Sequence, residues 1–371
     1  MNHQWYLDLA ASGIAMPIAA HLELHDQSEP GPILQDGRRL GAIVEQTSRR
    51  YGMPLAIPLM DLAVEKSAIL EALGIGTADR EAFHFETGPT PKQIAAVESA
   101  LDNAITERMR VTCEAIQYIA AETDLLPVGM CIGAFSLMTK LLSDPITPVF
   151  MYGAGLTAGD DPEVARMLAC LDISVTAICA YVKAQMRAGA RAIFMCEPAA
   201  NTVYISPNQL EGDLDVFDNL VIRSDRRIKK VLDEGGADLI LHDCGELTEG
   251  MVRRLASLDP AILSLGSSRT LWNDAALVPP TTVLFGNLPS KHFYSDEKVS
   301  REDVTRMSGE LIEKMNRTGH PFILGTECDV LSISESESIL RGKVDAMTAT
   351  ADRIRACRTE GIIHQSVSRS N

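Results

Sequence analysis

The sequence predicts a single (β/α)8 barrel, an α/β fold of the TIM-barrel type. The chain has 371 residues, a length that one such barrel reaches when it carries insertions. Eight short apolar runs have the character of buried strands, and nearly all are separated by segments with a helical period. We therefore expect one domain over residues 1–371, with a short helical N-terminal extension at about residues 1–13. An open, doubly wound sheet is the alternative.

The first half of the chain supplies four strand candidates. We place these strands at residues 14–24, 54–61, 126–135 and 191–198. Gly74 has the position of a helix C-cap, and Pro91 stands near the start of a helix. The helices predicted in this half lie at residues 40–51, 64–73, 91–105, 108–122, 136–142 and 162–188, with a loop after Asp144-Pro145.

The second half repeats the alternation of strand and helix. The strand candidates are residues 237–246, 261–266, 281–287 and 321–328. The predicted helices are residues 216–234, 248–255, 301–318 and 335–350. Parallel strands connected by helices return to the same sheet, which favours the barrel.

Composition excludes several classes of function. The chain carries 34 basic and 50 acidic residues, and its formal net charge is -16. Such an acidic surface repels phosphate backbones and anionic lipid, so we expect neither nucleic-acid nor membrane-surface binding. We see no signal peptide and no run of 18 apolar residues. The eight cysteines are scattered among apolar runs, which indicates reduced thiols in a cytoplasm.

The most informative stretch is the fifth strand candidate, which ends in His242 and Cys244. Side chains at positions i and i+2 of a strand share one face, so the imidazole and the thiol lie together. Together they form half of a soft-metal site of the kind that binds Zn²⁺, and Cys328 is the best candidate for a third ligand. Three ligands would leave the fourth tetrahedral position open for chemistry. The alternative is a core histidine beside a buried thiol.

Further polar residues follow other strands. In such barrels catalytic groups sit at the C-terminal ends of the strands, where we also place Asp61, Glu197 and Asn287. Each has a structural alternative, such as capping the next helix or hydrogen bonding at the barrel mouth. For His21 and His25 we favour a surface or capping role.

Several motifs resemble the uroporphyrinogen decarboxylase superfamily, and within it the branch of zinc-dependent, corrinoid-linked methyltransferases. They are Met60-Asp-Leu-Ala-Val-Glu65, Gly129-Met-Cys-Ile-Gly-Ala-Phe135, Glu197-Pro-Ala-Ala200 with Ile205-Ser-Pro207, His242-Asp-Cys-Gly245, Gly286-Asn287 and Gly325-Thr-Glu-Cys-Asp-Val330. The resemblance implies that His242, Cys244 and Cys328 are zinc ligands. Three features depart from it: Ala134 stands where proline is frequent, the His364-Gln-Ser tail has no match, and Arg38-Arg39 poorly matches the arginines with which the decarboxylases hold substrate carboxylates.

The resemblance also implies a reaction. The first choice is the transfer of a methyl group from an O-methyl donor, an aryl methyl ether above all, to a corrinoid protein. The chain contains no Asp-x-His-x-x-Gly segment, so the cobalamin must come from a partner protein or as free cofactor. In this reaction Asp61 and Glu197 would manage protons or orient His242, and Asn287 would hydrogen-bond the substrate.

Three alternatives remain open at this point. The chain could transfer methyl from a methylated corrinoid protein to a thiol such as coenzyme M, or it could be a metal-free, decarboxylase-like lyase. The third is a non-enzymatic zinc-binding or scaffold protein, which would need a closed four-ligand site. The sequence is compatible with an oligomer.

Overall fold

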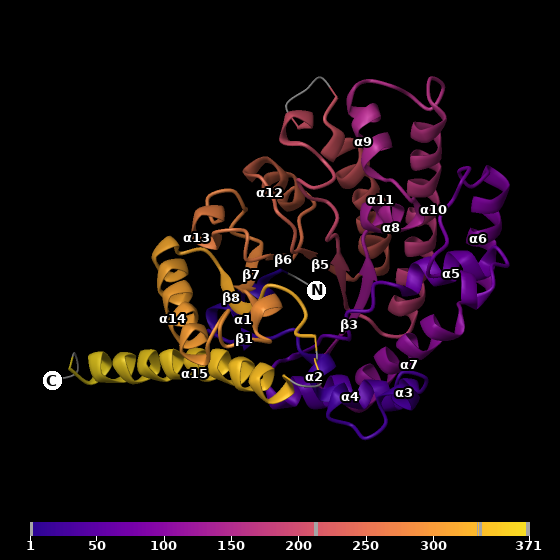
Figure 1. The fold of residues 1–371 in the computed structure, drawn as a ribbon. Coiled ribbons are helices and arrows are strands. Elements are labelled where there is room, and N and C mark those ends of the chain that lie inside the picture. Colours follow the sequence, from indigo (N-terminus) through magenta and orange to yellow (C-terminus); the bar gives the residue numbers. More distant parts are fainter. Residues whose placement is uncertain (1–2, 211–213, 332, 334–335, 369–371) are drawn as a thin grey trace.

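Eight parallel strands form one curled sheet in the computed structural model, which describes residues 3–210, 214–331, 333 and 336–368 (Figure 1). Their order in the sheet is β1-β8-β7-β6-β5-β4-β3-β2, the order expected of a (β/α)8 barrel. The predicted fold class is therefore confirmed. The strands are β1 Ala15–Met16, β2 Leu55–Ala56, β3 Leu126–Ile132, β4 Ala192–Cys196, β5 Asp238–Asp243, β6 Ile262–Leu265, β7 Val283–Leu288 and β8 Phe322–Thr326.

The two edges of the sheet are β1 and β2, and each is only two residues long. Among the described residues no ladder joins them to each other; β1 pairs with β8, and β2 pairs with β3. Pro17 follows β1 and Pro58 stands two residues after β2. Since proline has no N–H to donate, neither strand can extend a regular ladder at these points.

Helices cover the outside of the sheet (Figure 1). Several begin with a sequence-encoded cap: Asp161 accepts the backbone N–H groups of Glu163 and Val164 at the start of α10, and Pro162 occupies its first position. The helices are α1 Gln4–Ala11, α2 Ala20–His25, α3 Pro30–Ile33, α4 Gly37–Arg50, α5 Val64–Ala72, α6 Pro91–Asn103, α7 Glu107–Glu122, α8 Ala134–Leu141, α9 Ile146–Gly153, α10 Pro162–Arg187, α11 Arg223–Gly235, α12 Glu249–Ala256, α13 Leu271–Asp274, α14 Arg301–Thr318 and α15 Glu337–Ser368.

Three sequence predictions need correction. The strand expected at residues 14–24 is wrong beyond β1, because Ala20–His25 is the helix α2. The loop expected after Asp144-Pro145 contains α9, Ile146–Gly153. The last helix, α15, runs to Ser368 rather than ending near residue 350. The first two errors share one cause: segments of only six to eight residues are too short to show the periodicity that separates strand from helix.

The N-terminal extension packs against the N-terminal end of the barrel. Its helix α1 contacts β7 and β8, and it ends before Gly13, whose positive φ of 71° terminates it. Tyr6 is fully buried, and its hydroxyl donates to Asp238 Oδ2 at 3.0 Å, at the start of β5. This contact covers the end of the barrel opposite to the one where the predicted site lies.

The longest apolar helix, α10, is a core element. By length and composition it could cross a membrane, but 67% of its most apolar stretch is buried inside the fold. This is the pattern of a helix that packs against a sheet and its neighbours.

Candidate metal centre

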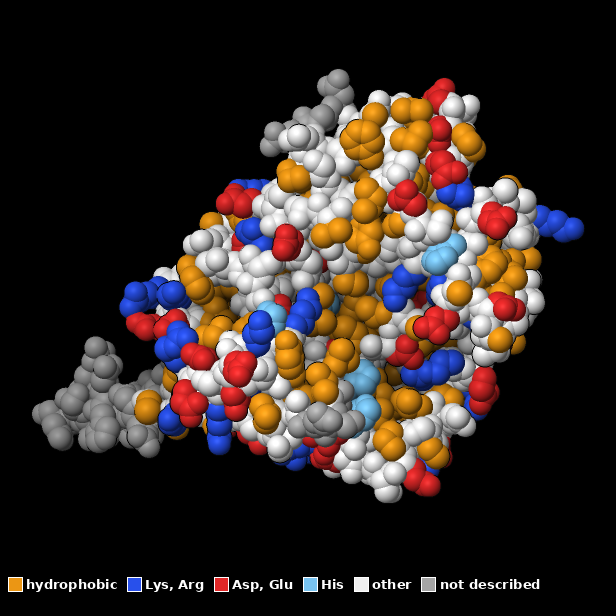
Figure 2. Space-filling model, viewed as in Figure 1, with side chains coloured by type: hydrophobic (Ala, Val, Ile, Leu, Met, Phe, Trp, Pro, Cys, Tyr) orange, Lys and Arg blue, Asp and Glu red, His pale blue; other side chains and the backbone are white. Residues whose placement is uncertain are grey.

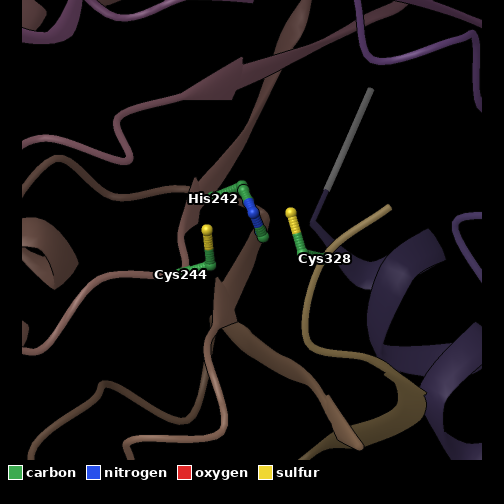
Figure 3. A group of neighbouring side chains, drawn as sticks. All are labelled: His242, Cys244 and Cys328. Carbon is green, nitrogen blue, oxygen red and sulfur yellow. The ribbon is translucent and has the colours of Figure 1, made fainter. Parts of the chain in front are cut away.

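Two side chains that are close in sequence, His242 and Cys244, meet the distant Cys328 at the C-terminal end of the sheet (Figure 3). His242 lies on β5, Cys244 follows the end of β5, and Cys328 follows the end of β8. Their potential ligand atoms all lie within 4.8 Å of one another. Within the described chain this group contains no fourth histidine, cysteine or carboxylate. The structure therefore brings together the three residues that the sequence analysis singled out.

His242 is held by the neighbouring strand. Its register partner on β6 is Ser264, whose hydroxyl lies 2.8 Å from His242 Nδ1. The imidazole is fully buried, and its other nitrogen, Nε2, has no hydrogen-bond partner among the described residues. A buried ring nitrogen without a partner costs free energy unless a ligand satisfies it. Figure 3 shows the ring between the two sulfurs, where a metal ion would supply that missing partner.

The two cysteines interact directly. A hydrogen bond from the Cys328 thiol, acting against burial, lowers the pKa of Cys244 to about 3. The same interaction raises the pKa of Cys328 well above its usual range. Two cysteine sulfurs and an imidazole form a donor set that suits a soft divalent ion such as Zn²⁺.

A short turn after β7 ties both cysteine segments in place, and the sequence analysis missed it. Ser290 Oγ donates to the Cys328 carbonyl at 3.0 Å, and Lys291 Nζ donates to the Cys244 carbonyl at 3.2 Å. Burial would lower the pKa of Lys291, but the negative charges of Cys244 and Glu327 raise it. A positive charge therefore stands next to the two sulfurs. The only signal in the sequence was its position just after a strand.

Glu197 follows β4 but takes part in a different contact. It is fully buried, and it accepts the backbone N–H groups of Phe135 and Ser136 at 2.9 Å each and the Ser136 hydroxyl at 2.6 Å. Burial and the charge of Glu197 raise the pKa of neighbouring Asp225 well above its usual range, so the proton stays on Asp225. A Cβ at Gly133 would stand 2.0 Å from the Glu197 carboxyl carbon. This carboxylate therefore fastens β4 to the start of α8.

Asp61 and Asn287 also have structural partners. Asp61 accepts the N–H of Ala63 at 3.1 Å, and its other oxygen pairs with Arg108 at 3.0 Å. Asn287 uses both amide hydrogens, donating to the carbonyls of Gly266 at 2.8 Å and Arg269 at 2.9 Å. Only the Asn287 carbonyl oxygen remains to contact a substrate. A catalytic role for Asp61, Glu197 or Asn287 stays a prediction.

His21 has a more specific contact than the surface or capping role suggested. On α2, its Nδ1 pairs with Asp329 Oδ2, in the segment that carries Cys328. Burial lowers the pKa of His21, but the hydrogen bond and charge of Asp329 outweigh it and the net shift is upward. The pair links α2 to the segment after β8 that carries the third sulfur.

Comparison with known proteins places this site in a family. A sequence model of the family described as "Uroporphyrinogen decarboxylase (URO-D)" matches residues 34–347, most of the chain. The chain belongs to the uroporphyrinogen decarboxylase family. It is thus a member of an enzyme family, and the family resemblance drawn from its motifs is confirmed.

Two known proteins, one similar in sequence and one similar in structure, are compared with this chain. A curated protein named uroporphyrinogen decarboxylase, from Teredinibacter turnerae, is 26% identical over 293 residues, which are 76% of this chain and 75% of the relative. Among solved structures, a methyltransferase from Methanosarcina mazei is similar with a TM-score of 0.63 and 18% identity, covering 92% of each chain. The second likeness shows a shared fold over nearly the whole length.

Proposed function

We propose that this protein is a zinc-dependent methyltransferase that moves a methyl group from an O-methyl donor, an aryl methyl ether above all, to a corrinoid protein. His242, Cys244 and Cys328 would hold the zinc, and the cobalamin would be carried by the partner. The eight free cysteines fit a reducing cytoplasm, where we place the protein.

One observation carries the proposal. The buried Nε2 of His242 has no hydrogen-bond partner among the described residues, and it and the two cysteine sulfurs lie within 4.8 Å of one another. A decarboxylase that needs no metal has no use for this arrangement. A closed structural zinc site would need a fourth protein ligand, and the described part of the chain offers three.

The chain's own residues would prepare the site. Ser264 fixes the ring of His242, and Ser290 and Lys291 fix the backbone of the two cysteines. A zinc ion held there would act as a Lewis acid toward the oxygen or sulfur whose bond to the methyl group is broken or formed. Lys291 would attract an anionic substrate group, since its ammonium has three donor hydrogens and lies beside both cysteines.

Lys291 also favours the second candidate. A methyl transfer from a methylated corrinoid protein to a thiol such as coenzyme M would require recognition of an acidic group near the bound sulfur, and Lys291 is a cation beside both cysteines. The metal centre would be the same in both directions of transfer.

The test uses the zinc-loaded protein, reduced cobalamin and a series of methoxyarenes. We expect the absorbance of methylcobalamin to appear with a suitable donor, and we expect Cys328→Ser to abolish it. Cys179→Ser is the matched control, because Cys179 is a similarly half-buried cysteine on α10, outside the metal centre. A parallel assay offers methylcobalamin to thiols, with and without an acidic group.

Two outcomes would contradict the proposal. The first is methyl transfer that survives complete removal of metal. The second is release of carbon dioxide from a porphyrinogen by the metal-free protein, which would identify a lyase like the relative from Teredinibacter turnerae.

A further inference from the structure

A pocket beside α5 collects positive charge in an otherwise acidic protein. Its lining includes Lys66, Arg80, His84 and Lys140, together with one carboxylate residue, Glu81, and its volume is about 560 Å³. The chain as a whole has a formal net charge of -16, so composition alone does not explain this grouping. Figure 2 shows basic side chains gathered over this part of the surface, beside the apolar hollow at the centre of the face.

The two lysines are held in place by backbone carbonyls rather than by carboxylates. Lys66 Nζ donates to the carbonyl of Glu81 at 3.1 Å, and Lys140 Nζ donates to the carbonyl of Leu62 at 3.0 Å. No carboxylate among the described residues forms an ion pair within 4.0 Å of either ammonium group. Each ammonium therefore has no directly paired carboxylate among the described residues, and the carbonyl takes one of its three donor hydrogens.

The like charges in the pocket oppose one another. Burial and the charge of Lys140 lower the pKa of Lys66, and burial and the charge of Lys66 lower the pKa of His84. Arg80 is fixed at the wall by a 2.9 Å ion pair to Glu71. Cations that converge without a partner destabilise a fold, whereas an anion placed between them reverses the sign of the interaction.

We propose that this pocket is a binding site for a phosphate group, taken up as free phosphate or as a phosphate ester. A phosphate group carries about 1.5 to 2 negative charges at neutral pH and several acceptor oxygens, which match two ammonium groups better than a monovalent ion does. Ala63 lines the pocket three residues after Met60, whose sulfur lies 3.9 Å from that of Cys328. The pocket therefore borders the rim of the barrel that carries the metal centre. The proposal does not depend on the methyltransferase function.

Calorimetric titration of the full chain tests it, with inorganic phosphate and glycerol phosphate as the two probes. We expect both to bind, and we expect Lys66→Gln/Lys140→Gln to weaken binding at least about tenfold, because two charge-assisted contacts are lost. The control is Lys229→Gln/Lys230→Gln, which removes the same charge from α11, where each lysine has a carboxylate partner. This variant should bind both probes as the parent does.

The two probes separate the sources of the phosphate group. Tighter binding of glycerol phosphate identifies an ester as the ligand class, whereas tighter binding of inorganic phosphate identifies the free ion. If circular dichroism shows that the double variant is misfolded, the single variants Lys66→Gln and Lys140→Gln are titrated instead. Each should bind both probes severalfold more weakly than the parent. The proposal is overturned if neither probe binds the parent, or if the lysine variants bind as the parent does.

Discussion

The ends of β4 and β5 carry two groups of polar side chains that differ in what their atoms contact. After β4, both oxygens of Glu197 accept hydrogen bonds from the start of α8. At the end of β5, Nε2 of His242 is equally buried and has no partner in the described chain. Because Glu197 and His242 both lie at strand ends, the sequence predicted both as residues of the active site. The comparison shows that a polar residue at a strand end is not by itself evidence of a ligand site, because Glu197 finds its hydrogen-bond partners within the fold.

The largest expected effect comes from the metal centre. Replacing any one of the three ligands, for example Cys244→Ser, should reduce zinc content from one ion per chain to nearly none, because three protein ligands are the minimum for a site of this type. Metal analysis after gel filtration measures it. Folding should persist, since the half-buried Cys244 and Cys328 contribute little to the core. Cys179→Ser should retain the metal.

Replacing Glu197, which follows β4, should lower stability and leave zinc content unchanged. Glu197→Ala leaves two backbone N–H groups and a hydroxyl without an acceptor, and we expect a loss of about 4 kcal/mol in the free energy of unfolding. Zinc content at low temperature should be unchanged. Urea denaturation measures the loss, with the surface variant Glu310→Ala as control. Stability close to that of the parent, together with loss of zinc, would show that Glu197 serves the metal centre instead.

A second buried carboxyl predicts a pH dependence. Burial raises the pKa of Glu65 to about 8, although the N–H of Ile132 donates to it. In the unfolded chain Glu65 loses its proton near pH 4.3, roughly its reference pKa. Above that pH the folded state binds more protons than the unfolded state. The free energy of unfolding therefore falls as the pH rises from about 4.3 through about 8. Between about pH 5 and pH 8 the parent should lose on the order of 3 kcal/mol relative to Glu65→Gln. Parallel curves for the two proteins would contradict a neutral Glu65.

Replacing Ser264, whose hydroxyl contacts His242, should have an intermediate effect on metal affinity. Ser264→Ala removes the hydroxyl beside Nδ1, and such partners of metal-binding histidines typically contribute about 10-fold to 100-fold in metal affinity. Competition with a chelator measures the change. Ser308→Ala is the control, because Ser308 is equally buried and its hydroxyl donates to a helix carbonyl in α14. Equal zinc affinity in both variants would contradict a role of the Ser264 hydroxyl in supporting His242 as a ligand.

The smallest effect is expected at Asp61. Its pair with Arg108 is partly exposed, with 35% and 29% of the two side chains accessible, so Asp61→Asn should change stability by less than about 1 kcal/mol. Steady-state kinetics then decides its role. A large fall in kcat without a change in stability would support the predicted catalytic function, and an unchanged kcat would leave only the structural contact.

Much of the fold could be predicted because its strands are buried on both faces. Such strands appear as continuous apolar runs, and all eight runs contain a strand. The exception within residues 14–24 is instructive. Glu23 of α2 is buried, and its carboxylate is compensated by Arg50 and Arg341, which lie far away in sequence. No local pattern reveals such a partner.

The metal centre could be predicted from the sequence about as well as the fold. Spacing of two residues placed His242 and Cys244 on one face, and the end of the last strand pointed to Cys328. The roles of Ser264 and Lys291 were not predictable, because they depend on the register between β5 and β6 and on the path of the turn after β7. Glu197 had the expected position but a different set of contacts.

X-ray absorption at the zinc edge of the zinc-loaded protein tests the central claim most directly. We predict a first coordination sphere with two sulfur atoms, one imidazole nitrogen and one light atom from solvent or substrate, and the loss of one sulfur in Cys328→Ser. A sphere filled by four protein ligands, or one without sulfur, would contradict an open site built by His242, Cys244 and Cys328.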